Sequence, residues 1–591
     1  MKYQNPAQRK LKEAAFFLLI FFLSLGLYLK IHINQGYLNW ESEIYGDKAG
    51  YYVYLPSVFF YHFNPNLFPA GIDEKTGFGF QLDTINHKVN TKYPYGVSLM
   101  VSPFFGISCL ISTVSGLSLM GGFAPLFHRM MGFSAIIYLV FGLWFLKKML
   151  ERKFSSRTAC ITTLLIYFAT NLIYYTVSEP LMSHVYSFFL FSLFLFSLDR
   201  FLKDENNYGA FFLICLSFVL AIIVRPVNCI LFLLYFFWDI RSGKEILQRV
   251  KNLFRPRYFL TFILIFTLFI LPQLFYWKYL TGNYFHYSYA GESFSDWNHP
   301  RILEVWFSTL NGLFLYTPVL LIFLAGLILM LMKRKRNSLL ILFVFLLMTY
   351  MAGSWHQWYF GCSYGQRTFI EYYVIFSFPA GFFLEWTITR WKFIFRGVLA
   401  LVLSIFTVFN IQMMYYYEKC FWGSTWDWNH FEWQLKKAKI IPWFEKDQNF
   451  SNDYENRILT LSMPVEDTLS HSGSHALYLR ADLFPYCVYE KPAKDLIGKG
   501  YRQVEASFHV LKYYNRPLDG VASCSIYLGK TLVFEQNAHF GKDIYTHGEW
   551  MEKTFLFDLP PKMNSFAVLR LHIQNNGSSD LFIDDLKVRF E

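Results

Sequence analysis

Two carboxylates lie four residues apart in the polar loop that follows the first apolar segment of the chain. They are Glu43 and Asp47, and a helical turn would place both side chains on one face. Gly46 lets the backbone turn tightly just before Asp47, so Asp47 is the better candidate for a general base. The alternative is a solvated loop in which the two acids only balance Lys48.

Aromatic side chains accompany these charges. Tyr51 and Tyr52 closely follow Asp47, and His356 stands in a second polar loop that is dense in glycine and aromatic residues. Rings beside a base could stack on a sugar ring. We therefore include these three residues among the candidates for binding.

Two arginines stand where phosphate ligands would be expected. Arg367 lies in a glycine-rich stretch of the same loop as His356, and a planar guanidinium fork suits a phosphate. Its alternative role is an ion pair with Glu371, four residues later. Arg225, just before Pro226, is the second candidate for phosphate binding. Its alternative role is that of a snorkelling side chain at a helix end.

A third polar site is the very short turn at Glu179, with His184 about one helical turn further on. So short a turn would hold its carboxylate close to the membrane surface. With one carboxylate from another loop, these two side chains could bind a divalent metal ion. Without a metal, Glu179 would be an acid at a helix start before Pro180, stabilised by the helix dipole.

The composition is that of a membrane protein. The chain has 591 residues, of which 54% are hydrophobic, 21% aromatic and only 16% charged. About eleven apolar segments occur in roughly the first 420 residues, and about 20 apolar residues are enough to cross a bilayer. A net charge of +12 would suggest a nucleic-acid partner in a soluble protein. Here most of the excess lies in short loops, so it indicates membrane topology and no nucleic acid.

Cationic loops alternate with acidic and aromatic loops, and placing the cationic loops in the cytoplasm gives one consistent path. That path has a cytoplasmic N-terminus, an exported C-terminus and helices near 14–31, 125–146, 159–177, 183–200, 208–225, 227–240, 258–277, 313–332, 338–354, 373–389 and 397–416. Segment 96–117 is also apolar enough to span, but counting it would move a basic cluster outside. We expect this segment to lie at the outer interface or to dip in and out, which fits the breaks at Pro94 and Pro103.

The pattern changes after about residue 445, where apolar runs give way to alternating polar and apolar residues. Such alternation, with turn residues between the runs, predicts an all-β antiparallel sandwich. The expected strands include 475–480, 504–510, 525–528, 568–573 and 581–588. The expected parts of the chain are a polytopic domain, a linker and a sandwich, at 1–420, 421–445 and 446–591. Cys487 and Cys524 could pair if the sandwich is exported.

The polytopic part resembles the GT-C class of membrane glycosyltransferases, which includes protein O-mannosyltransferases and bacterial aminoarabinose transferases. The resemblance is carried by the loop with Glu43 and Asp47 and by the motifs Tyr51-Tyr52-x-Tyr54-Leu55-Pro56, Tyr93-Pro94-Tyr95-Gly96, Ser178-Glu179-Pro180, Arg225-Pro226 and Gly361-x-Ser363-x-Gly365-x-Arg367. It implies transfer of a sugar from a polyprenyl phosphate carrier, with Asp47 where the class keeps its first-loop catalytic carboxylate. The chain lacks the adjacent Asp-Glu pair of the O-mannosyltransferases, which leaves the acceptor and any metal requirement open.

The tail resembles jelly-roll carbohydrate-binding modules, chiefly through its closing segment Leu581-Phe582-Ile583-Asp584-Asp585-Leu586-Lys587-Val588. This resemblance implies a sandwich that holds an acceptor glycan near the outer loops. The alternative is a packing cap over those loops.

The sequence thus predicts an α-helical polytopic glycosyltransferase of the bacterial inner membrane, followed by an extracytoplasmic β-sandwich. The donor would be a polyprenyl-phosphate-linked sugar, and the acceptor a hydroxyl of a glycan, lipid or protein. Catalysis is assigned to Asp47 and Glu43, and binding to Arg367, Arg225, Tyr51, Tyr52, Glu179, His184 and His356. A divalent metal ion stays open as a cofactor.

Two other functions are compatible with parts of this pattern. A transporter or flippase of a lipid-linked glycan would also use arginines and aromatics, but the chain shows no inverted repeat and no matching broken helices. A membrane-anchored sugar-binding protein without activity would not need a body of about eleven helices.

Overall fold

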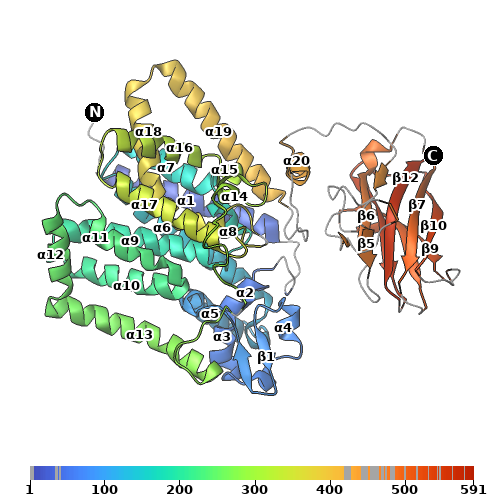
Figure 1. Ribbon diagram of the computed structural model, residues 1–591, viewed down its shortest axis with the longest axis horizontal. Coiled ribbons are helices and arrows are strands. Elements are labelled where there is room, and N and C mark those ends of the chain that lie inside the picture. The colour runs from blue at the N-terminus through green and yellow to red at the C-terminus, as the bar shows by residue number, and fades with distance from the viewer. Residues whose placement is uncertain are drawn as a thin grey trace. The chain divides into compact units, whose positions relative to one another are not determined.

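The computed structural model describes two compact units, and we describe each by itself. They are Met1–Tyr415, the membrane body, and Tyr416–Glu591, the tail (Figure 1). The described residues are 6–32, 38, 42–289, 291–361, 363–417, 428–440, 450–452, 465–466, 471–472, 476–479, 486–497, 501–513, 517–529, 531–541, 544, 548–561, 563–577 and 579–591. Residues 421–427 and 441–445 of the predicted linker lie outside them, as does the predicted start of the sandwich at residue 446.

The membrane body is built from helices that differ greatly in length (Figure 1). The long or apolar ones are α1 (Pro6–His32), α5 (Gly96–Val114), α6 (Pro125–Leu150), α7 (Ser156–Phe168), α9 (Ser183–Lys203), α10 (Tyr208–Val224), α11 (Leu231–Phe237), α13 (Pro256–Thr281), α16 (Leu320–Met332), α17 (Ser338–Ser354), α18 (Tyr373–Arg390) and α19 (Phe393–Tyr415). The shorter or more polar ones are α2 (Asp47–Tyr52), α3 (Tyr54–Pro56), α4 (Ile72–Lys75), α8 (Leu172–Val177), α12 (Gly243–Leu253), α14 (Ile302–Phe307) and α15 (Leu313–Tyr316). A small hairpin of β1 (Gln81–Asp83) and β2 (Lys88–Asn90) lies between α4 and α5.

Glycines allow some of these helices to approach closely. A Cβ atom added at Gly142 of α6 would lie 3.2 Å from the Cα of Phe189 in α9. A Cβ atom added at Gly326 of α16 would lie only 2.0 Å from the carbonyl oxygen of Pro379 in α18. Small residues at such contacts let backbones pack against one another, as is common between membrane helices.

Six helices of the described body are long and apolar enough to cross a membrane: Lys10–His32, Gly96–Val114, Pro125–Leu150, Ser183–Lys203, Pro256–Thr281 and Phe393–Tyr415. The prediction of a mostly helical body that contains candidate membrane spans is confirmed, whereas the predicted number of about eleven spans is not. Several predicted spans are shorter or interrupted. The segment predicted as one helix at 159–177 is divided into α7 and α8, and the segment at 313–332 is divided near Pro318 into α15 and α16.

Helix α5 corresponds to the predicted interfacial segment 96–117. By length and composition it could also cross the membrane, and Pro103 lies inside it. Its contacts with α6 include a hydrogen bond of 2.6 Å from Tyr138 to the carbonyl oxygen of Met100, and packing of Phe105 on Phe127. Phe127 lies near the start of α6 and Tyr138 at its middle. Neither contact distinguishes an interfacial α5 from one that crosses the membrane, so the interfacial placement of α5 stays a prediction.

The basic segments of the body meet at the end where α1 starts and α6 ends. Lys148, near the end of α6, contacts Glu13 in α1 at 2.6 Å. Lys153, just after α6, contacts Asp239 at 2.5 Å. Three of the segments predicted to be cytoplasmic, around Glu13, Lys148 and Asp239, thus lie together, as the predicted topology requires.

The tail contains two antiparallel sheets around one apolar core (Figure 1). The larger sheet has the order β10 (Trp550–Asp558), β7 (Gln503–Lys512), β12 (Leu581–Phe590), β5 (Ala476–Leu479) and β4 (Val465–Glu466), and β3 (Phe450–Asn452) also pairs with β12. The smaller sheet has the order β6 (Tyr486–Pro492), β11 (Ala567–Asn575), β8 (Gly520–Leu528) and β9 (Thr531–Phe540). Helix α20 (Trp428–Lys437) precedes the sheets in the chain.

The predicted sandwich is confirmed, and each expected strand has its counterpart in β5, β7, β8, β11 or β12. The alternation has a direct physical basis in β11, where Leu569 and Leu571 face the core and Arg570 faces outward. The pattern did not reveal β6, β9 and β10. Cys487 and Cys524 are both free thiols.

We expect the C-terminus and the cationic loop between α16 and α17 to lie in opposite compartments, because cationic loops are retained in the cytoplasm. A reporter that is active only when exported should be active when fused after Glu591 and inactive when fused after Lys335, in the loop between α16 and α17. Equal activity of the two fusions, or activity of the fusion after Lys335 alone, would contradict the predicted path.

Candidate functional site

Glycines fix the position of Asp47 at the start of α2. Gly46 has a φ of +57°, and its amide donates a hydrogen bond of 2.8 Å to the carbonyl oxygen of Thr76. A Cβ atom at Gly79 would lie 1.8 Å from the carbonyl oxygen of Gly46, and one at Gly50 would lie 2.2 Å from the carbonyl oxygen of Gly79. The chain can therefore pass this closely only because glycines stand at these positions.

The site is centred on an ion pair between two loops that are far apart in the sequence. A terminal nitrogen of Arg367, in the short helix η5 (Arg367–Phe369), lies 3.5 Å from the Oδ2 atom of Asp47. The side chain of Asp47 is 42% exposed and that of Arg367 is 19% exposed. Burial alone would lower the pKa of Arg367, but the charge of Asp47 raises it above its ordinary value. The guanidinium therefore stays charged at physiological pH.

Two tyrosines with tilted rings in contact lie next to this pair. The rings of Tyr51 and Tyr93 have centroids 4.4 Å apart, and the Tyr51 hydroxyl donates to the Ser183 hydroxyl at 3.4 Å. Burial raises the pKa of Tyr93 well above its ordinary value, and the charge of Asp47 raises it further. Both phenols are thus neutral and can donate hydrogen bonds. Tyr93, which the sequence showed only as part of a short motif, belongs to the site.

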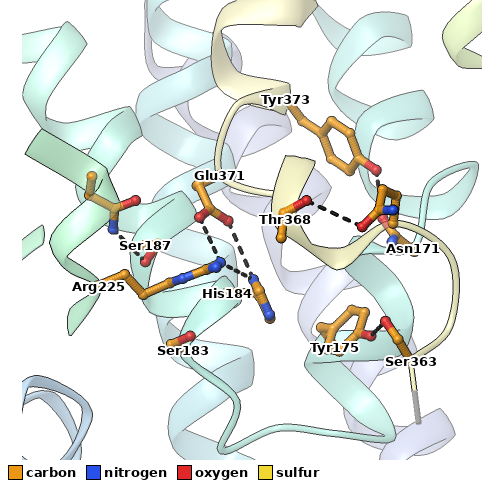
Figure 2. Close-up of polar contacts among 12 residues, drawn as sticks. Asn171, Tyr175, Ser183, His184, Ser187, Arg225, Ser363, Thr368, Glu371 and Tyr373 are labelled. Carbon is orange, nitrogen blue, oxygen red and sulfur yellow. Dashed lines mark hydrogen bonds and ion pairs between the residues drawn. The ribbon is translucent and has the colours of Figure 1, made fainter. Parts of the chain in front are cut away.

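A second cation is held in a buried network at the ends of three helices (Figure 2). Arg225, at the end of α10, contacts Glu371 at 2.8 Å and the Nδ1 atom of His184 at 2.9 Å. The His184 ring also lies 3.4 Å from the Glu371 carboxylate, which is fully buried. Burial raises the pKa of Glu371 to about 7, although the charge of Arg225 opposes this shift. Glu371, which the sequence offered as an alternative partner of Arg367, is therefore the partner of Arg225.

Hydrogen bonds anchor the glycine-rich loop that carries Arg367 (Figure 2). Asn171 donates to the carbonyl oxygen of Tyr364 at 3.1 Å and accepts a bond of 2.6 Å from the Tyr373 hydroxyl. The hydroxyls of Tyr175 and Ser363 lie 2.7 Å apart. The break between α7 and α8 places Asn171 where it can make these contacts. The irregular helix is thus what positions the loop.

Glu179 has an ion-pair partner on the first loop. Lys48 contacts Glu179 at 2.6 Å and donates to the carbonyl oxygen of Ser42 at 2.6 Å, with its side chain almost fully buried. Glu179 lies in the turn between α8 and α9, and not at a helix start. The alternative role suggested for this residue is therefore wrong. Lys48 thus forms an ion pair with a carboxylate outside its own loop.

The predicted metal ligands of the body, Glu179 and His184, contact different partners. Glu179 pairs with Lys48, whereas His184 contacts Arg225 and Glu371. Among the described residues, the three side chains that lie close enough together to hold a metal ion belong to the tail and not to the body.

Glu43 is in a different environment from Asp47. Helix α2 begins only at Asp47, and Glu43 lies before the left-handed Gly46, so the two acids do not share a helix face. The prediction that a helical turn places Glu43 and Asp47 on one face was wrong, because Gly46 with its positive φ interrupts the helical backbone between them. Glu43 is instead buried, with His32 and His128 each 3.4 Å from one of its carboxylate oxygens.

Two further predicted binding residues, Tyr52 and His356, are not linked to Asp47 or Arg367 by the contacts of the described residues. The Tyr52 side chain is fully buried, packs against Phe105 and donates to the carbonyl oxygen of Gly122. It therefore belongs to the core. His356 packs against its neighbour Trp355, with ring centroids 5.1 Å apart, and its amide donates to the carbonyl oxygen of Ser293.

No protein-family model matches the chain, and a comparison with curated proteins finds no match. Among solved structures, the chain is similar to the CBM22-1 xylan-binding domain of Xyn10C from Paenibacillus barcinonensis. The identity is 14% and the TM-score 0.18, and the match covers 24% of this chain and 92% of that domain. A TM-score this low carries no inference about what the chain binds.

Glu43 should stabilise the fold in a pH-dependent way. Burial alone would raise its pKa, but contacts with His128, His32 and Tyr28 lower it to about 2, from an ordinary value of 4.5. This stabilisation is therefore present above pH 4.5 and is lost as the pH falls towards 2, amounting to about 3 kcal/mol in total. The difference in unfolding free energy between wild type and Glu43→Gln, measured in detergent, should shrink between about pH 5 and pH 3.

The matched control is Glu432→Gln, because Glu432 forms an exposed ion pair with Lys436 within α20. Exposed pairs of this kind contribute about 0–1 kcal/mol, so this variant should behave like the wild type. A difference between wild type and Glu43→Gln that does not change with pH would contradict the assignment.

Proposed function

We propose that the membrane body is a glycosyltransferase that takes a sugar from a polyprenyl-phosphate-linked donor. The observation that carries this proposal is the contact between Asp47 and Arg367, which come from loops far apart in the sequence. Asp47 is a carboxylate that can accept a proton, and Arg367 is a permanent cation that can hold a phosphate. Transfer of a sugar from a phosphate carrier to a hydroxyl needs both groups side by side.

In this mechanism Asp47 takes the proton of the acceptor hydroxyl as its oxygen attacks the anomeric carbon of the donor. The bond from that carbon to the phosphate oxygen breaks, and the departing phosphate carries the electron pair. Arg367 stabilises the negative charge as it develops on the phosphate. The phenols of Tyr51 and Tyr93 lie beside Asp47 and can donate hydrogen bonds to a sugar.

The arrival of the donor would itself activate the base. Arg367 contacts Asp47 at 3.5 Å, and a guanidinium presents five N–H donors in a planar fork. A donor phosphate would compete with Asp47 for these donors. Once the phosphate has become the main partner of Arg367, the carboxylate loses part of its stabilising positive charge and becomes a stronger base.

Arg225 has a supporting role in this proposal. Its side chain is 18% exposed and is oriented by Glu371 and His184. The charge of Arg225 also lowers the pKa of Tyr51, although burial raises that pKa overall, so these two side chains lie within electrostatic range of each other. A second cation here would bind the phosphate of the carrier, while Arg367 stabilises the charge that develops on the departing phosphate oxygen.

A transporter or flippase of a lipid-linked glycan is the alternative. Such a protein would hold its substrate near the middle of the membrane, between structural repeats. Asp47 and Arg367 instead lie in loops outside the candidate membrane spans. Reconstituted protein that moves labelled lipid between leaflets but never changes the mass of an acceptor would favour this alternative.

Replacement of the base should nearly abolish transfer. Asp47→Asn keeps the size of the side chain but removes its ability to accept a proton, which should lower the rate about 10²–10⁴-fold. The measurement is mass spectrometry of surface glycans and glycolipids from cells that carry either form. Asp83→Asn, in the exposed hairpin of the same loop, is the control and should leave the product unchanged. Wild-type turnover by Asp47→Asn would remove Asp47 from the mechanism.

A double-mutant comparison tests whether Asp47 and Arg367 act together. The combined variant Asp47→Asn, Arg367→Gln should lose much less activity than the product of the two single losses, because residues that act as one unit are not additive. The exposed ion pair of Asp296 with Arg301, 2.9 Å apart, offers a matched control. Its two single variants and their combination should all retain activity.

We also propose that the tail binds a glycan on the outward face of its smaller sheet. Tyr527 lies on this face with Arg570 over its ring at 5.1 Å, and Arg570 contacts Glu490 at 2.8 Å. An aromatic ring flanked by oriented polar groups is suited to a sugar, which offers both an apolar face and hydroxyls.

Removal of this ring should weaken glycan binding by the full-length protein. We expect Tyr527→Ala to lower affinity about tenfold on an oligosaccharide array, because the stacked face is lost. Tyr513→Ala removes an exposed tyrosine that directly follows β7 of the other sheet, and it should have no effect. Equal binding by wild type and Tyr527→Ala would place the glycan site elsewhere or exclude it.

A further inference from the structure

Two imidazoles and a carboxylate converge on the larger sheet of the tail. The rings of His471 and His509 are stacked, with centroids 3.7 Å apart and planes inclined by 11°. The Oδ2 atom of Asp585 lies 2.7 Å from the Nδ1 atom of His471 and 3.4 Å from the Nδ1 atom of His509. Three side chains distant in the sequence thus direct their donor atoms to one point.

The backbone around this group is shaped to hold it. The pairing of β12 with β7 shifts register between Asp584 and Lys587, and Asp585 has a φ of +52° within this bulge. Bulges of this kind re-aim a side chain out of the regular pleat. A positive φ at a non-glycine residue costs energy, and strain of this kind clusters at functional sites.

The segment with His471 is fastened to the same bulge. The amides of His471 and Ser472 donate to the Oδ2 atom of Asp584 at 2.8 and 3.0 Å. The Ser472 hydroxyl donates to the Oδ1 atom of Asp585 at 2.6 Å. One oxygen of Asp585 is therefore held by a neighbour, and the other faces both rings. A second shell that orients the ligands is typical of metal sites.

We propose that His471, His509 and Asp585 bind a divalent transition metal ion, of which Zn²⁺ is the representative. In a tetrahedral site with bonds of about 2.0–2.1 Å, neighbouring ligand atoms lie about 3.3 Å apart. The contact of Asp585 with His509 already has this spacing. The shorter contact with His471 must open by about 0.6 Å, and the half-exposed His471 ring can rotate. A water molecule would complete the site.

The donor set decides the class of metal. Imidazole nitrogens suit Zn²⁺, Cu²⁺ and Ni²⁺, whereas Ca²⁺ and Mg²⁺ prefer sites made of oxygen atoms. Such an ion would join β7, β12 and the segment at His471 into one rigid unit. This proposal does not depend on the proposed transfer reaction, because its residues lie in the tail.

The test is a titration of metal-stripped, full-length protein in detergent with ZnCl₂, read by competition with a chromophoric chelator. We expect one tightly bound Zn²⁺ per chain, and Co²⁺ in its place should show the intense visible absorption of a tetrahedral site. His509→Ala and Asp585→Asn should each weaken binding at least about 100-fold, because loss of a ligand exceeds the 10–100-fold effect of losing a second-shell group.

His539→Ala is the matched control, because His539 also lies 3.4 Å from an aspartate, Asp519, but forms no group with a second imidazole among the described residues. It should bind Zn²⁺ like the wild type. Limited proteolysis of each variant, with the tail as resistant as in the wild type, establishes that the sandwich is folded. The proposal would be overturned by equal Zn²⁺ affinity in wild type and in folded Asp585→Asn. Absence of binding by the wild type at millimolar Zn²⁺, or binding of Ca²⁺ in preference to Zn²⁺, would overturn it as well.

Discussion

The ion pair of Asp47 with Arg367 is the contact on which the arrangement of the candidate site depends. It joins the loop after α1 to the loop before α18, and it requires both loops to be rigid. Rigidity on one side comes from the glycine contacts of Gly46, Gly50 and Gly79. On the other side it comes from the hydrogen bonds that Asn171 makes with the loop of Arg367. In the proposed mechanism, Asp47 and Arg367 can act together only if their supports hold them to within a fraction of an ångström.

The helices of the body are irregular where they meet this site. Helix α7 ends early so that Asn171 can reach the second loop, and α10 ends at Arg225, whose extended backbone precedes Pro226. Such breaks leave backbone groups without helical partners, and membrane proteins accept them only where other groups can satisfy those atoms. The shortened helices and the polar loops are therefore consequences of one constraint, which is the need to bring charges together at one end of the bundle.

The sequence predicted those features that depend on composition and local pattern. Apolar runs indicated the helical body, and period-two alternation indicated the sandwich with strands such as β11 and β12. Gly46 singled out Asp47, since a glycine before an acid suggests an unusual backbone, and Gly46 does have a positive φ. The partners could not be predicted in this way. Arg367 has both Glu371 four residues away and Asp47 far along the chain, and only the folded loops decide in favour of Asp47. Likewise, nothing local indicated that His471, His509 and Asp585 would meet.

The charges around the site also constrain what it can accept. Three cations, Lys48, Arg225 and Arg367, are matched by three carboxylates, Glu179, Glu371 and Asp47. The pKa of Glu371 is about 7 because it is fully buried, so near neutral pH this carboxylate is protonated in part of the molecules. In each such molecule the positive charge of Arg225 is uncompensated. Since an unpaired buried charge is costly, an anionic group that arrives there lowers the energy of the site. A neutral sugar would gain nothing from this arrangement, whereas a sugar attached to a phosphate would.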